Sequence, residues 1–159
     1  MDGMNDEELF KLAVSTRQFE IQMFWQRSSY FMVLNTAIAI AFFSLKEGMR
    51  GAIVALLGVL ACIVWCMINL GSKYWQIRWE EAAARFEKQC APEAKLFSAS
   101  SDEIQAVVKN HLDNGSHTRL KRWHNAQILR KPSVSSWMLI LSFCFTIIWV
   151  LLFFVSLCA

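Results

Sequence analysis

The sequence is short of charge, proline and glycine. Only 18% of its 159 residues are charged, whereas an ordinary soluble domain carries about 25%. The low charge and the 55% hydrophobic content exclude a disordered chain, and a net charge of +3 gives no overall basic surface for DNA. With two prolines and six glycines, the chain is also not a loop-rich scaffold. No segment alternates apolar and polar residues as a strand would.

Three long stretches of the chain contain no charged side chain. They cover residues 28–45, residues 51–72 and the whole sequence after Lys131. A bilayer core of about 30 Å is crossed by roughly 20 helical residues, so the second and third stretches fit well and the first is near the short limit. A chain of 159 residues cannot cover three such helices with polar surface in water. We therefore expect an all-α membrane protein with three transmembrane helices.

These stretches divide the chain into four parts. They are a cytoplasmic N-terminal amphipathic helix (1–27), a transmembrane hairpin (28–72), a cytoplasmic helical region (73–131) and a third transmembrane helix (132–159). All Lys and Arg residues except Lys46 and Arg50 lie outside the hairpin loop, on what the positive-inside rule makes the cytoplasmic side. We expect a multi-pass protein of the bacterial inner membrane with a cytoplasmic N-terminus and a periplasmic C-terminus.

The predicted cytoplasmic parts are helical and small. The N-terminal helix can run unbroken into the first span, and residues 72–88 continue the second span as a charged helix. Ser100 and Glu103 form a capping box that begins a further helix. So small a region makes only a marginal core. We expect an antiparallel helical cytoplasmic extension that packs on the N-terminal helix or on another subunit.

Arg, Glu and Trp side chains gather near the predicted inner membrane boundary. One interpretation is a salt-bridged collar that couples the cytoplasmic helices to the spans, with Glu80, Glu81 or Glu87 as carboxylate partners. The other is ordinary anchoring of Arg and Trp at the membrane interface. The candidate coupling residues are Arg17, Glu20, Trp25, Arg27, Trp75, Arg78, Trp79 and Glu80.

Two amides and a glycine are the candidates for packing between spans. Asn35 and Asn69 lie at membrane depth, where an amide seeks a hydrogen-bond partner, and Gly58 allows close helix contact. The amides could instead line a wet path. No span contains Asp, Glu, Lys, Arg or His, so the usual signature of a proton relay, a voltage sensor or an ion-coupled transporter is missing.

A cluster of basic residues precedes the third span. It could bind anionic lipid, a nucleotide or RNA, or simply anchor the helix that follows. Its members are Arg119, Lys121, Arg122, Arg130 and Lys131. Arg119 and His124 also have the Arg-x4-His spacing of HEPN-type ribonucleases. The histidines are too irregularly spaced for a metal site, and no phosphate-binding glycine loop is present. We expect no catalysis, no cofactor and no metal.

The order of parts resembles the SLATT-like small helical membrane effectors of bacterial conflict and anti-phage systems. The likeness covers the N-terminal helix, the hairpin and the extension beginning Ser72-Lys-Tyr-Trp-Gln-Ile-Arg-Trp-Glu-Glu, with the runs 24–28 and 75–80 as its most distinctive sequences. The third span is additional. The resemblance implies a homo-oligomer with a pore-forming or membrane-perturbing output, governed by a partner or a nucleotide signal.

Three hypotheses for the function follow. The first is a non-enzymatic oligomeric effector that alters the permeability of the inner membrane in response to a cytoplasmic signal or partner, in anti-phage defence. The second is a membrane-anchored adaptor or sensor that recruits a soluble partner without conducting. The third is a HEPN-like ribonuclease that depends on His124.

Overall fold

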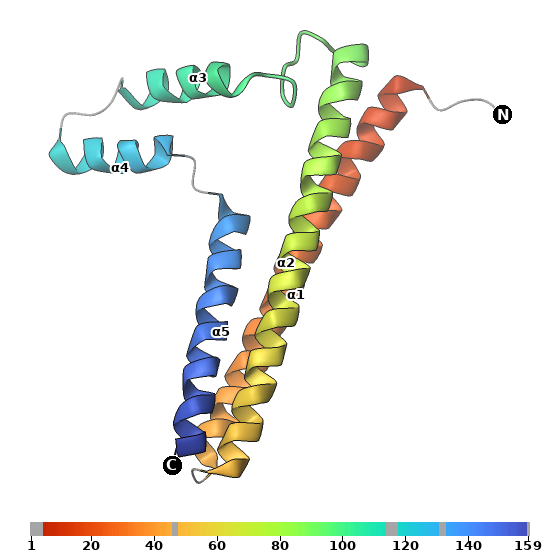
Figure 1. Cartoon of the computed structure of the whole chain (residues 1–159). Coiled ribbons are helices and arrows are strands. Elements are labelled where there is room, and N and C mark those ends of the chain that lie inside the picture. The colour runs from red at the N-terminus through yellow and green to blue at the C-terminus, as the bar shows by residue number, and fades with distance from the viewer. Residues whose placement is uncertain (1–4, 46–47, 114–117, 131–132, 159) are drawn as a thin grey trace. The chain divides into compact units, whose positions relative to one another are not determined.

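The computed structural model describes residues 5–45, 48–113, 118–130 and 133–158. Its helices are α1 (Asp6–Ser44), α2 (Met49–Cys90), α3 (Ser101–Asp113), α4 (Arg119–Leu129) and α5 (Val134–Cys158) (Figure 1). No strand occurs within these described ranges, so the all-α prediction is confirmed. Lys46, Glu47 and Lys131 lie outside the described residues.

The two longest helices have simple sequence causes. α1 contains neither glycine nor proline, and α2 contains no proline, so nothing in either sequence forces a break. The predicted continuity of the N-terminal helix with the first span, and of the charged helix with the second, is confirmed.

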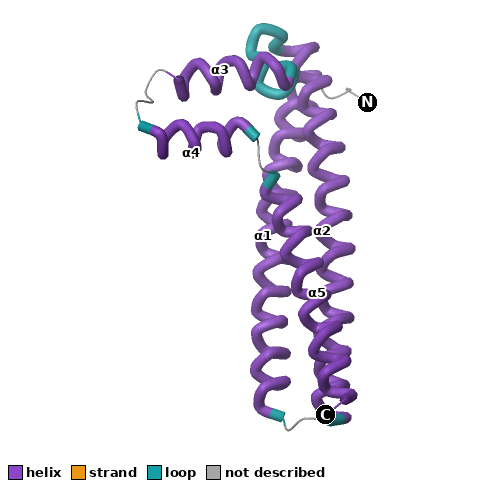
Figure 2. Tube along the Cα trace, turned by 60° about the vertical axis from the view of Figure 1, so that its left-hand side comes forward, coloured by secondary structure: helices purple, strands orange, loops and turns teal. Residues whose placement is uncertain are grey.

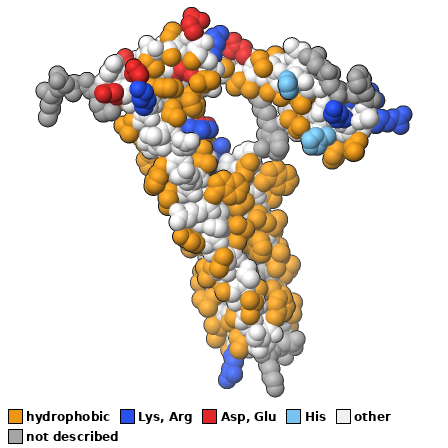
Figure 3. Space-filling model, turned by 180° about the vertical axis from the view of Figure 1, so that it is seen from behind, with side chains coloured by type: hydrophobic (Ala, Val, Ile, Leu, Met, Phe, Trp, Pro, Cys, Tyr) orange, Lys and Arg blue, Asp and Glu red, His pale blue; other side chains and the backbone are white. Residues whose placement is uncertain are grey.

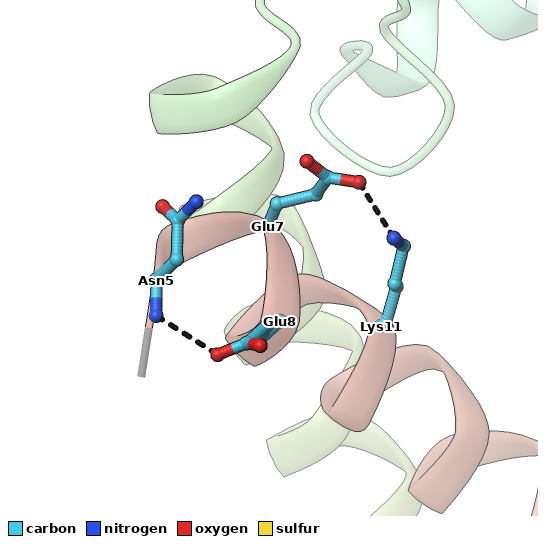
Figure 4. A network of polar contacts seen from close by, with 4 residues as sticks. All are labelled: Asn5, Glu7, Glu8 and Lys11. Carbon is cyan, nitrogen blue, oxygen red and sulfur yellow. Dashed lines mark hydrogen bonds and ion pairs between the residues drawn. The ribbon is translucent and has the colours of Figure 1, made fainter. Parts of the chain in front are cut away.

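The start of α1 is stabilised by acidic side chains. Glu8 Oε2 accepts a hydrogen bond from Asn5 N at 3.2 Å, and Lys11 Nζ lies 2.6 Å from Glu7 Oε1 (Figure 4). Negative charge in the first turn complements the positive end of the helix dipole. The hydrogen bond and the charge of Lys11 lower the pKa of Glu7, so the Glu7 carboxylate stays ionised near neutral pH.

The chain forms two compact units. Unit 1 comprises Met1–Arg17 and Ile77–Val134, and unit 2 comprises Gln18–Gln76 and Ser135–Ala159. In unit 2, α1, α2 and α5 lie side by side (Figure 2). Phe24, Trp65 and Met138, one from each helix, form a buried cluster there, with the Phe31 ring stacked on Trp65 at a centroid separation of 6.1 Å. Unit 2 is therefore a three-helix bundle with an aromatic core.

Much of the visible outer surface of unit 2 is hydrophobic (Figure 3). Among the described helices, α2 and α5 are long and apolar enough to cross a membrane, by length and composition, and α1 is not one of these two. Exposed side chains such as Leu57 and Leu151 would meet water at a cost of about 25 cal/mol per Å² of apolar surface. A lipid environment removes that cost.

In unit 1, small residues bring α1 and α2 together. Ala13, Ala82 and Ala83 are buried against one another, with Phe10 and Phe97 among the larger side chains around them. The predicted capping box is confirmed at the start of α3. Glu103 N donates to Ser100 Oγ at 3.2 Å, and Ser100 N donates to Glu103 Oε2 at 2.8 Å. Caps of this kind satisfy amides that the first helical turn leaves free.

Candidate functional site

Asn35 is the centre of a buried polar junction in unit 2. Its Oδ1 accepts hydrogen bonds from Trp149 Nε1 at 2.9 Å and from Cys62 Sγ at 3.0 Å, and its Nδ2 donates to the Phe31 carbonyl at 2.9 Å. Asn35, Cys62 and Trp149 come from α1, α2 and α5 and are all buried. One amide therefore joins three helices, and its polar atoms are satisfied without water.

Gly58 supplies the space for this junction. A Cβ placed on Gly58 would overlap Trp149 Cδ2 and lie 2.6 Å from Cε2, which is closer than real carbon atoms pack. The indole ring thus lies directly on the backbone of α2. Gly58 was predicted to serve span packing, and the structure brings it together with Asn35 through Trp149.

A second polar junction joins the same three helices at another level of the unit 2 bundle. Ser28 Oγ donates to Asn69 Oδ1 at 3.4 Å and accepts from Trp65 Nε1 at 3.5 Å, while Asn69 Nδ2 donates to the Met138 carbonyl at 3.4 Å. These distances are long, so the bonds are weaker than those of Asn35. The three helices are again linked through one amide. Both predicted amides therefore lie within the bundle of unit 2.

The candidate coupling residues fall into two separate groups. In unit 2, Arg27 Nη1 donates to Ser72 Oγ at 3.2 Å and lies 3.9 Å from Glu20 Oε2. That carboxylate oxygen is buried and accepts no hydrogen bond within the described part of the chain. In unit 1, Arg17 Nε and Nη2 donate to Glu80 Oε1 at 3.1 and 2.8 Å.

Phe97 extends the unit 1 group. The Arg17 guanidinium lies 5.6 Å from its ring centroid, within cation–π range. Phe10 packs edge-on against the same ring at 6.1 Å. Phe97 belongs to the segment after α2, which sequence reasoning did not consider, so the contact of Arg17 with this segment was missed.

The other predicted coupling residues differ in their surroundings. Trp79 packs on the buried alanine cluster of unit 1, whereas Trp25 and Trp75 are about half exposed and Arg78 is exposed.

In the basic cluster, Arg119, Lys121 and Arg122 are exposed on α4, and Arg130 Nη1 lies 3.5 Å from Gln127 Oε1. Lys131 lies outside the described residues. No group of three or more His, Cys, Asp or Glu side chains that could hold a metal occurs in the described part.

Sequence reasoning also missed Glu87 in its actual role. Glu87 is fully buried, and its carboxylate accepts hydrogen bonds from the backbone N–H groups of Leu96, Phe97 and Ser98 at 2.7–2.9 Å. The sequence alone allows Glu87 as one of three alternative carboxylate partners for the collar arginines. The prediction of Glu87 as a collar residue is therefore wrong, because backbone amides of the following loop occupy its oxygens.

Removing the Asn35 amide should destabilise unit 2. Asn35→Leu leaves Trp149 Nε1 and Cys62 Sγ without their acceptor, and we expect a loss of about 1–2 kcal/mol. Unfolding of the detergent-solubilised chain would measure it. In the matched control Thr36→Val, the lost hydroxyl bonds only the Met32 carbonyl of its own helix, so little change is expected. Strict additivity of Asn35→Leu with Trp149→Phe would contradict a direct bond.

The comparison with known families concerns nearly the whole chain. Neither a curated protein nor a solved structure matches the sequence. The sequence model of the octameric membrane protein family (8xMP) matches residues 7–158, which include all five helices except the first residue of α1. The chain therefore belongs to the octameric membrane protein family.

Proposed function

We propose that this protein is a non-enzymatic homo-oligomer whose assembly alters the permeability of the bacterial inner membrane. The proposal is supported by the octameric family to which the chain belongs. A ring of identical subunits encloses a central axis. In a membrane, such an axis conducts only if the surfaces that face it carry polar groups. The question is then which surface of unit 2 is polar.

The observation that carries the proposal is a polar stripe on α1. Six uncharged polar residues fall within an arc of about 80° of the helix surface, given 100° per residue, and all six are exposed. The exposed apolar residues Val33 and Ile40 share this arc. We call the six polar residues the α1 stripe: Gln18, Gln22, Gln26, Ser29, Thr36 and Ser44. Unlike α2 and α5, α1 is not among the helices that are long and apolar enough to cross a membrane by themselves. A helix of this composition suits a wet axis better than lipid.

The proposed arrangement in the membrane has three crossings. Residues 28–45, which include the second half of α1, cross beside α2 and α5, with the N-terminus cytoplasmic and the C-terminus periplasmic. The bias of Lys and Arg towards 1–27 and 71–134 supports this orientation. Residues 73–131 then face the cytoplasm, where they would receive a nucleotide signal or a soluble partner. A role as an effector in anti-phage defence fits this arrangement.

Charge at Thr36 tests the proposal. If the α1 stripe faces a pore, Thr36→Lys places a ring of eight ammonium groups around it, and Thr36→Asp places a ring of carboxylates there. We expect opposite shifts of the reversal potential in planar bilayers, with Lys favouring anions and Asp favouring cations. The matched control Leu60→Ile, on the exposed apolar surface of α2, should conduct as the wild type does.

The opposite outcomes are equally clear. If the stripe faces lipid, both charged variants fail to insert, because a charge at membrane depth costs several kcal/mol. Wild-type chain that reaches the membrane but never conducts, and that purifies with a stoichiometric soluble partner, would contradict the pore and favour the adaptor.

A further inference from the structure

Helices α3 and α4 of unit 1 carry apolar side chains that the described residues leave uncovered. Val107 on α3 is 71% exposed, and Leu120 and Trp123 on α4 are 76% and 61% exposed. α4 has no buried residue at all within its described length. Isolated helices of fewer than about 12–15 residues are marginal in water, and α3 and α4 have 13 and 11. A partner surface is needed to hold them.

The two helices carry complementary surfaces. α3 borders an open groove of about 580 Å³, with Ala99, Ile104, Val107 and Val108 as apolar walls. Glu103 and Lys95 lie at its edge, and Lys95 Nζ is 3.5 Å from Glu103 Oε1. Asp102 in the same helical turn is not part of the groove, since it lies about 140° around the helix from Val107 at 100° per residue. On α4, Leu120 and Trp123 are three residues apart and so share one face. That helix contains Arg119, Lys121 and Arg122 and no acidic residue.

The fold keeps these surfaces apart within one chain. Ile104 and Val108 of α3 line a shared groove with Ile128 and Leu129 of α4, and Asn125 Nδ2 donates to the Leu112 carbonyl at 3.1 Å. The start of α3 therefore lies beside the end of α4. Trp123, near the start of α4, lies towards the other end of the pair, away from its own Glu103.

We propose that the Trp123 face of α4 binds the α3 groove of a second copy of this chain. Contact of two different surfaces is heterologous, and its repetition around an axis can close a ring, which agrees with an octameric family. Arg119, about 40° around α4 from Trp123 at 100° per residue, would then meet Glu103 of the neighbouring copy. Trp and Arg are the residues that most often dominate protein interfaces. This inference needs the oligomer of the family but not the change in permeability proposed above.

A membrane surface is the competing occupant of the α4 face. Basic residues beside Trp123 would suit anionic headgroups. A membrane surface bound to α4 leaves the α3 groove empty, however, and its anionic headgroups would repel Asp102 and Glu103. Binding to a second copy accounts for both helices at once, and for the opposite charges that they carry.

Charge reversal with rescue tests the contact in the full chain. Arg119→Glu and Glu103→Lys should each shift the particle in mild detergent to a mass below that of eight chains, and the double variant should restore it. Lys109→Glu, about 160° around α3 from the groove residue Val107 at 100° per residue, is the matched control and should leave the mass unchanged. Trp123→Ala should also shift the mass, since an exposed side chain is removed without a cavity.

Cysteine cross-linking tests the geometry. Differently tagged chains carrying Val107→Cys or Leu120→Cys, when expressed together, should form a mixed covalent dimer well above the background of the wild-type cysteines. Neither variant alone should do so. Wild-type mass in both reversed variants, or pairing of Val107→Cys with itself, overturns the proposal. If the α4 variants lose binding to anionic vesicles while the mass of their particle stays that of the wild type, the α4 face binds the membrane surface instead. A ring that assembles and cross-links as described but does not conduct leaves this inference intact and removes only the proposed function.

Discussion

Gly58→Ala is expected to destabilise the bundle of unit 2 by about 3 kcal/mol, the upper part of the range for overpacking in a core. The added methyl group would overlap Trp149 Cδ2 and lie 2.6 Å from Cε2 and 2.7 Å from Cε3. The indole cannot bend away, because it is a rigid ring, only 3% exposed, whose Nε1 is bonded to Asn35. Either α5 shifts away from α2 or the hydrogen bond breaks.

The other helical glycines of α2 provide graded controls. A Cβ at Gly71 would meet nothing within 4 Å, so Gly71→Ala should stabilise the helix by about 1 kcal/mol. At Gly51 the nearest atom is Ser156 Oγ at 3.2 Å, which requires only a small shift of that side chain. Thermal unfolding in detergent, followed by tryptophan fluorescence, should give the order Gly71→Ala, Gly51→Ala, Gly58→Ala from most to least stable. A Gly58→Ala protein as stable as the Gly71→Ala protein would contradict the close packing.

The sequence predicted the helices of this protein better than their contacts. Long uncharged stretches and the lack of proline predicted the courses of α1 and α2, and the spacing of Ser100 and Glu103 predicted the start of α3. These features depend on neighbouring residues alone. Only part of the membrane prediction is confirmed. Three spans were predicted, and two helices, α2 and α5, are long and apolar enough to be candidate spans among the described residues.

The contacts depend on residues far apart in the chain. Asn35 was predicted to need a partner, but nothing local marks Trp149 as that partner among the seven tryptophans. Likewise, Glu87 looks in the sequence like any acid on a charged helix. Its role depends on a chain reversal at Lys95, whose φ of 45° lies in the left-handed region. That turn brings three amides back to the end of α2, and no simple pattern encodes it.

The carboxylate of Glu87 should make the loop after α2 depend on pH. Burial alone would raise its pKa, but hydrogen bonds from Ser98, Phe97 and Leu96 outweigh burial and lower the pKa below its ordinary value of 4.5. A carboxyl whose pKa is lower in the folded state stabilises that state above the unfolded pKa. The contribution is lost as the pH falls through the lower, folded pKa. We therefore expect the loop to loosen only in acid, below about pH 4.5.

Glu87→Gln removes this contribution at neutral pH. The neutral amide has one accepting oxygen in place of two and presents an NH₂ group to amides that need an acceptor. We expect a loss of about 2–3 kcal/mol. Hydrogen exchange of Leu96, Phe97 and Ser98 in the intact chain should therefore speed up by about 30- to 150-fold at pH 7.

The consequence extends beyond the loop, because Phe97 packs on Phe10 and lies under Arg17. Release of the loop should weaken the cluster that joins α1 to α2 in unit 1. Glu81→Gln, an exposed acid on the same helix, is the matched control and should change neither the exchange nor its pH dependence. If the Glu87→Gln protein protects these three amides as the wild type does, the carboxylate does not hold the loop. The link from Glu87 through Phe97 to Arg17 and Glu80 would then fail with it.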